Sequence, residues 1–140
     1  MPDVFTQEKR SAVMSRIRAS GNRDTELRMI SVFRKYGITG WRRNARVFGK
    51  PDFVFPREKV AVFVDGCFWH RHPGCKFAYM PKSRLQFWLR KFESNVARDK
   101  AVTRTLRKTG WQIARIWECE LRRGRWPNIA RRIARLRSEG

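Results

Sequence analysis

Residues 51–65, PDFVFPREKVAVFVD, decide the fold of this 140-residue chain. Two apolar runs rich in β-branched and aromatic residues, Phe53–Phe55 and Val60–Val64, flank the turn-like segment at 56–59. Such runs are typical of buried strands, and a short polar connection between them favours a hairpin. We therefore expect two buried strands that pair as a hairpin, with the turn Gly49-Lys50-Pro51 ahead of them.

Helical patterns lie on both sides of this hairpin. Apolar residues recur every three or four positions and alternate with basic faces, which is typical of amphipathic helices. Helices are predicted at residues 7–19, at 24–36, at 83–109, where a break near the middle is left open, and from Pro127 onward; residues 111–117 alternate as a further strand. In the second helix the apolar positions are Leu27, Ile30, Val32 and Phe33. This order predicts one α/β domain over residues 1–140, with a central mixed sheet flanked by helices.

The chain carries an extreme positive charge. It has 33 Lys and Arg against 12 Asp and Glu, a formal net charge of +21 and a pI near 11.6. A surface this basic attracts polyanions, so DNA or RNA is the expected partner. A membrane is disfavoured, because the sequence shows no run of about 18 apolar residues, no signal peptide and no lipidation motif. The pattern does not separate arginines between 98 and 137 that contact phosphate from those of a solvated basic face.

Two of the scarce acidic residues flank the expected hairpin. Asp52 stands at the start of one strand and Asp65 at the end of the other, so strand pairing brings both carboxylates to the same end of the sheet. Hard cations such as Mg²⁺ favour one or two carboxylates together with water and phosphate oxygens. The pair therefore predicts a magnesium site, and Glu26 could add a third oxygen. The alternative is a turn residue and a strand-end cap.

Both histidines and two of the three cysteines fall within residues 66–75, GCFWHRHPGC. The spacing C-x₄-H-x₂-C is compatible with three ligands of one tetrahedral Zn²⁺, and a further cysteine could close the shell. The candidate zinc ligands are Cys67, His72, Cys75 and Cys119. This assignment leaves His70 free and would hold the loop around it still. The alternative is three reduced thiols in the core.

Together these motifs resemble the very short patch repair endonucleases. The resemblance covers residues 9–121 and rests on Pro51-Asp52, VFVDGCFWH at 62–70, Phe87-Trp88, N-x-x-R-D at 95–99, Gly110-Trp111 and W-E-C at 117–119. Members of that family resemble restriction enzymes of the PD-(D/E)xK fold. The resemblance implies an enzyme that uses Mg²⁺ to nick one strand of duplex DNA 5′ to the thymine of a T:G mismatch. Such mismatches arise when 5-methylcytosine deaminates, and the nick begins their repair.

The resemblance also implies roles for individual residues. Asp52 becomes the principal Mg²⁺ ligand, His70 activates or positions the attacking water, and Glu26 supports them. Some relatives carry Thr-His where this chain has Val64-Asp65, which implies that Asp65 is a direct metal ligand here. DNA contacts are implied from the minor groove, from an aromatic wedge in the major groove and from polar groups at the mismatched pair; the residues are Met14, Phe68, Trp69, Trp88, Lys91 and Asn95.

The implied setting is DNA repair. Expected partners are double-stranded DNA with a T:G mismatch, mismatch-repair proteins and a DNA polymerase that resynthesises the patch. The enzyme is expected to be a monomer in the bacterial cytoplasm, at the nucleoid, with catalytic Mg²⁺, structural Zn²⁺ and an N-terminal helix (residues 1–20) on the DNA. Two alternatives stay open: a restriction-like or defence nuclease of the same fold, and a zinc-stabilised DNA-binding protein without catalysis. The latter has no use for Asp52, Asp65 and His70 together.

Overall fold

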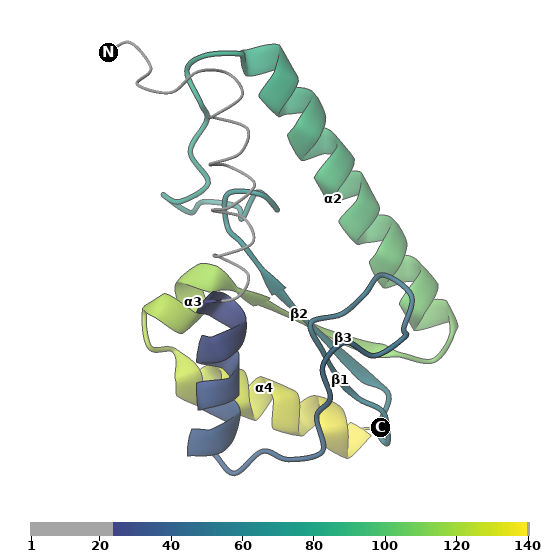
Figure 1. The fold of residues 1–140 in the computed structure, drawn as a ribbon. Coiled ribbons are helices and arrows are strands. Elements are labelled where there is room, and N and C mark those ends of the chain that lie inside the picture. Colours follow the sequence, from purple (N-terminus) through teal and green to yellow (C-terminus); the bar gives the residue numbers. More distant parts are fainter. Residues whose placement is uncertain (1–23, 140) are drawn as a thin grey trace.

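The computed structural model describes residues 24–139, in which a three-stranded mixed sheet carries helices on both faces (Figure 1). Strand β1 (Phe53–Phe55) pairs antiparallel with β2 (Val60–Asp65), so that Phe53 lies opposite Val62. Strand β2 pairs in parallel with β3 (Gln112–Trp117), and the order is β1-β2-β3. The predicted hairpin, the third strand and the mixed α/β sheet are confirmed.

The helices predicted within residues 24–139 are confirmed, and the structure adds one short helix, α3 (Glu118–Arg122), that was not predicted. In chain order the helices are one at residues 24–35, α2 (Leu85–Lys108), α3 and α4 (Trp126–Glu139). Helix α2 runs through 24 residues without interruption, so the break left open near its middle is absent. Helix α4 begins one residue before Pro127, which therefore occupies the first turn, where its missing N–H is not needed. The predicted helix at 7–19 and the DNA-contacting segment 1–20 lie outside the described residues.

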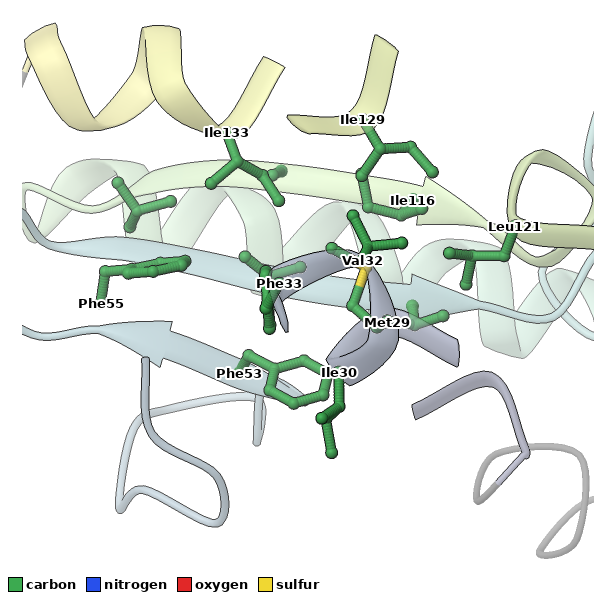
Figure 2. Close-up of a cluster of buried hydrophobic side chains, with 14 residues drawn as sticks. Met29, Ile30, Val32, Phe33, Phe53, Phe55, Ile116, Leu121, Ile129 and Ile133 are labelled. Atoms are coloured by element: carbon green, nitrogen blue, oxygen red, sulfur yellow. The ribbon is translucent and has the colours of Figure 1, made fainter. Parts of the chain in front are cut away.

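One face of the sheet holds the large hydrophobic core. There the helix at 24–35, α3 and α4 pack on the strands, and Figure 2 shows their apolar side chains meeting over the sheet. The Phe33 ring lies at the centre, edge-on to Phe53 at 5.2 Å and to Phe55 at 5.8 Å. Burial of each such ring stabilises the fold by about 1.5–3 kcal/mol. Leu27, expected among the apolar positions, is instead 50% exposed, and Met29 is buried in the core.

The other face of the sheet carries α2. Because strand side chains alternate, Val60, Val62 and Val64 enter the large core, whereas Ala61 and Phe63 meet Val102 and Leu106 of α2. The same alternation turns Asp65, the last residue of β2, toward α2. The turn before β1 also approaches this helix: at Gly49, with φ +80°, an added Cβ would lie 2.3 Å from the Val102 side chain, so only glycine fits.

No helix in the described range 24–139 is long and apolar enough to serve as a membrane span. The longest, α2, ends in Arg107 and Lys108 and buries few of its side chains, among them Phe92, Val102 and Leu106. Its other side chains are partly or fully exposed.

Candidate active site and metal centre

A pocket of about 160 Å³ opens where the ends of the β1–β2 hairpin meet α2. The residues lining it include Asp52, Asp65, His70, Asn95 and Asp99. The hairpin explains the first two, because antiparallel pairing brings the residue before β1 next to the end of β2. The prediction that both carboxylates reach the same end of the sheet is confirmed.

Asp52 is a partly buried carboxylate that accepts a backbone hydrogen bond and lies next to Glu26. The backbone N–H of Val64 donates to its Oδ2 at 2.6 Å. Burial raises the pKa of Asp52 to about 7; the Val64 hydrogen bond lowers it, and the neighbouring carboxylates of Glu26 and Asp65 raise it. Glu26 is itself paired with Arg43. A desolvated carboxylate with acidic neighbours is stabilised by a cation, and oxygen donors of this kind suit Mg²⁺.

The raised pKa of Asp52 predicts a pH-dependent stability in magnesium-free buffer. A carboxyl whose folded pKa of about 7 exceeds its ordinary 3.8 stabilises the fold fully below pH 4 and loses that contribution as the pH rises through 7. Asp52→Asn, neutral throughout, should therefore be more stable than wild type by about 4 kcal/mol at pH 8 and almost equal to it near pH 4. Urea unfolding at both pH values measures this, with Asp24→Asn at an exposed carboxylate as control. A gap that does not change with pH would contradict it.

Asp65 is only 3% exposed and is held by Arg115. The Arg115 Nη1 atom lies 3.2 Å and 3.0 Å from the two carboxylate oxygens of Asp65. Burial raises the pKa of Asp65, while the charges of His70 and Arg115 act against that rise. Each carboxylate oxygen has two lone pairs, so the contact with Arg115 leaves acceptor capacity on Asp65 for a cation.

His70 is oriented by a second carboxylate. Its Nδ1 lies 2.5 Å from Oδ2 of Asp99 on α2 and 4.0 Å from Oδ1 of Asp65. Burial lowers the pKa of His70, but the hydrogen bond to Asp99 and the negative charges of Asp65 and Asp99 raise it, and the net shift is upward. Because Nδ1 contacts Asp99, Nε2 is the nitrogen left for a water or a phosphate. An imidazole held in this way is suited to proton transfer near neutral pH.

The sequence-based prediction gave Asp99 no role and counted Arg115 only among the arginines at 98–137, without separating phosphate contacts from a solvated basic face. Asp99 follows Asn95 by one helical turn, so both side chains face the loop after β2, and Asn95 Nδ2 donates to the Trp69 carbonyl at 3.2 Å. That spacing, within the N-x-x-R-D motif, was the available signal. Arg115 donates also to the Asp99 carbonyl at 3.2 Å and to Thr103 Oγ1 at 3.0 Å. Its signal was a charged residue in the middle of an apolar strand.

The predicted cysteine and histidine ligands come together in one cluster. The candidate ligand atoms of Cys67, His72, Cys75 and Cys119 all lie within 4.8 Å of one another. Parallel pairing explains the long-range member, because Asp65 lies opposite Trp117 and the two strands are followed by Cys67 and Cys119. Burial raises the pKa of the Cys67 and Cys119 thiols. A bound cation would reverse this, since it binds the thiolate.

The imidazole of His72 completes the cluster. Its Nδ1 lies 3.4 Å from the Cys119 sulfur, and its ring stacks on Trp117 with 4.2 Å between centroids and 16° between planes. His70 is not a member of the cluster, as predicted. The donor set of three thiols and one imidazole fits a metal ion, so this cluster is a candidate metal centre that joins the end of β2 to the start of α3.

Aromatic residues form a partly exposed cluster beside the pocket. The Trp69 ring lies 5.3 Å from Phe68 and 5.7 Å from Trp88, and Phe68 lies 5.6 Å from Trp88. Trp69 and Trp88 are half-buried, while Phe92 beneath them is buried. The Arg71 guanidinium lies 3.9 Å from the Phe92 centroid and donates to the Phe68 carbonyl at 3.1 Å, which fixes the loop. The indole rings of Trp69 and Trp88 therefore expose apolar surface to solvent, while the buried Phe92 ring and the Arg71 contacts hold them in place.

Two further predicted DNA-contacting residues lie on α2, and one cannot be placed. Asn95 lines the pocket and contacts the Trp69 carbonyl, and Lys91 is exposed one turn earlier. Met14 lies outside the described residues, so its contact with DNA stays a prediction.

Comparison with known proteins gives consistent matches. The family model described as DNA mismatch endonuclease Vsr matches residues 2–76. Type II nicking enzyme V.XorIIP of Xanthomonas oryzae pv. oryzae is 38% identical over 121 residues, which cover 86% of this chain and 88% of that protein. DNA mismatch endonuclease Vsr of Escherichia coli K12 is 38% identical over 124 residues, 87% of this chain and 77% of the relative. V.NmeAIP, a type II nicking enzyme of Neisseria meningitidis serogroup A, is 38% identical over 122 residues, 87% of this chain and 86% of the relative.

A pocket that holds three carboxylates and a carboxylate-oriented histidine, on so basic a chain, suits hydrolysis of a DNA backbone, and the relatives support the conclusion that this protein is a DNA endonuclease. The matches also identify the family, because each of these relatives is 38% identical over most of the chain. The chain belongs to the Vsr family of DNA mismatch endonucleases. The resemblance seen in the sequence motifs is thereby confirmed.

Proposed function

We propose that this enzyme nicks one strand of duplex DNA 5′ to the thymine of a T:G mismatch, with Mg²⁺ as its catalytic cofactor. The observation that carries the proposal is the convergence of Asp52, Asp65 and His70 in one pocket beside half-buried tryptophans. A hairpin flanked by two carboxylates, Asp52 and Asp65, within a mixed sheet supports assignment to the restriction-endonuclease-like fold. The relatives, two nicking enzymes and a mismatch endonuclease, support the reaction.

The carboxylates of Asp52 and Asp65 would hold Mg²⁺, with Glu26 in support. A bound Mg²⁺ supplies charge neutralisation at the attacked phosphate and at the leaving oxygen. Burial of both carboxylates raises the pKa of each, so a bound cation would stabilise their charged forms. Arg115 keeps Asp65 in place without using all of its oxygen lone pairs.

His70 would handle the proton of the attacking water. The Nδ1 atom lies 2.5 Å from the Asp99 carboxylate, which leaves Nε2 to contact the attacking water. The carboxylate also stabilises the imidazolium that forms when the ring accepts a proton. Because Asp99 lies on α2 and His70 on the loop after β2, this contact also ties the loop to the helix.

The aromatic cluster would supply selectivity. Phe68, Trp69 and Trp88 are proposed to enter the base stack next to the mismatch, where unstacking costs about a few kcal/mol and less where pairing is already poor. Lys91 and Asn95 would meet the mismatched pair. Mismatch-repair proteins and a polymerase that resynthesises the patch stay predictions.

We assign Zn²⁺ to the cysteine and histidine cluster. Thiolate and imidazole donors favour zinc in tetrahedral sites. Zinc there would fix both ends of the loop that carries Trp69 and His70. Rigidity matters because a displacement of about 1 Å at reacting groups can cost about 10²-fold in rate.

The test compares nicking and binding on a T:G duplex and the same duplex with C:G, for wild type and Trp69→Ala. We expect wild type to nick the T:G duplex selectively in Mg²⁺. Trp69→Ala loses stacking worth about 1–3 kcal/mol per base but keeps the phosphate contacts, so its preference for T:G should fall by about one to two orders of magnitude. Its affinity for the matched duplex should change little.

The control variant is Phe48→Ala, which removes an aromatic ring that is 58% exposed and outside the cluster. An equal loss of affinity on both duplexes by Trp69→Ala would mean that Trp69 only supports the fold. Efficient cleavage of the matched duplex by wild type would favour the restriction-like alternative.

A further inference from the structure

A second hollow, larger than the active-site pocket, lies beside it. It is a cleft of about 750 Å³ between the second half of α2 and β3, an edge strand of the described sheet. It shares Asp65, His70, Asp99 and Arg115 with the active-site pocket, so these four residues form a wall between the two hollows. The cleft is therefore continuous with the proposed reaction centre.

Four cations line this cleft from one helical face, which we call the α2 basic stripe: Lys100, Arg104, Arg107 and Lys108. Their spacings of three and four residues place them on the same side of the helix. All four are exposed, and none has an ion-pair partner within residues 24–139. By contrast, Arg132 and Arg137 of α4 pair with Glu120 and Glu58. An uncompensated row of like charges repels itself and is relieved by a polyanion.

The order of contacts along α2 indicates which part of the DNA would lie there. Trp88 of the aromatic cluster is near the start of the helix, Asn95 and Asp99 reach Trp69 and His70 from its middle, and the basic stripe follows. At about 1.5 Å per residue, the stripe from Lys100 to Lys108 covers about 12 Å of the helix beyond Asp99 and its contact with His70. One DNA strand rises about 3.4 Å per nucleotide along the duplex axis, so a stripe parallel to that axis spans about three phosphates.

We propose that the cleft along the α2 basic stripe binds the phosphate backbone of the cleaved strand on the 5′ side of the nick, away from the mismatch. This inference rests on the proposed function, because the aromatic cluster marks the mismatch side and the nick falls 5′ to the thymine. The helix then spans the site in three successive parts: base wedge, reaction centre and backbone clamp. Among the many arginines of the chain, Arg104 and Arg107 are assigned to phosphate contact.

The experiment removes two charges from the cleft and two from elsewhere. Arg104→Ala/Arg107→Ala is compared with Arg131→Ala/Arg135→Ala, whose exposed side chains lie on α4, across the sheet from α2 (Figure 1). Binding is measured in Ca²⁺ at several salt concentrations on three T:G duplexes: full length, trimmed 5′ of the nick, and trimmed 3′ of the mismatch. Thermal melting checks that both variants fold.

On the full-length duplex, the cleft variant should lose about tenfold or more in affinity, and the slope of log K against log salt should fall by about 2, one for each phosphate contact. On the duplex trimmed 5′ of the nick, it should match wild type. The control variant should lose less than twofold on every duplex. Equal losses for the two variants, or a cleft-variant loss that survives 5′ trimming and disappears on 3′ trimming, would overturn the assignment.

The proposed function is read separately from the same titrations. Wild-type discrimination between T:G and C:G duplexes tests the mismatch assignment alone. A wild type without that discrimination would overturn the proposed function. The cleft assignment would still be tested, because mapping the nick identifies its 5′ side, and the cleft variant either loses affinity for DNA on that side or does not.

Discussion

Asp52→Ala is expected to lower the rate of nicking on a T:G duplex by at least about 10³-fold, because it removes the carboxylate proposed as the principal Mg²⁺ ligand. A bound metal contributes several kcal/mol of charge stabilisation to phosphoryl transfer, and about 4 kcal/mol corresponds to this factor. Duplex binding should stay intact or tighten slightly, since a negative charge near the phosphates is lost. Single-turnover nicking assays in Mg²⁺ and in Mn²⁺, together with a binding titration, measure both effects.

The control for Asp52→Ala is Asp24→Ala, which removes an exposed carboxylate from the helix at 24–35. It should nick at the wild-type rate. Robust cleavage by the Asp52→Ala protein would exclude Asp52 as a metal ligand.

Cys67→Ser or Cys119→Ser is expected to remove the zinc and to destabilise the fold strongly. Purified wild type should contain about one zinc per chain, and each variant should contain much less. Structural zinc stabilises isolated zinc-finger peptides by about 10–16 kcal/mol; a chain with its own core depends on a fraction of that, which predicts a fall in Tm of about 10 °C or more. Metal analysis and thermal melting measure these changes.

The two histidines provide the matched comparison for this prediction. His72→Ala should lose zinc, because His72 lies in the cluster with its Nδ1 3.4 Å from the Cys119 sulfur. His70→Ala should keep zinc and melt close to wild type, while nicking falls by about 10²-fold or more. The opposite pattern, with zinc lost from His70→Ala and retained by His72→Ala, would reverse the two roles.

Local sequence patterns sufficed for the parts of the site that depend on neighbouring residues. The β-branched and aromatic runs at Phe53–Phe55 and Val60–Asp65 specify paired strands, and pairing alone brings Asp52 and Asp65 together. The zinc ligands of the loop follow from their spacing. Cys119 could be added because the segment before it alternates as a strand, which the structure places beside β2.

Contacts between distant segments were not predictable from such patterns. Asp99 meets His70 across 29 positions of sequence, and Arg115 meets Asp65 across 50, so no local period connects them. Helix rotation is similarly a tertiary property: Met29 rather than Leu27 enters the core because packing against the sheet selects the buried side. The five-residue helix α3 is too short to show a helical period.

Residues 65–72, DGCFWHRH, place a proposed metal carboxylate, two candidate zinc ligands, two wedge rings and the proposed base within eight consecutive positions. A single inserted or deleted residue would move every later group out of register with partners on β3 and α2. This segment can therefore diverge only by substitution at constant length. Evolution of a new target preference is accordingly expected to proceed through exposed positions of α2, such as Lys91, where changes leave the spacing of the loop untouched.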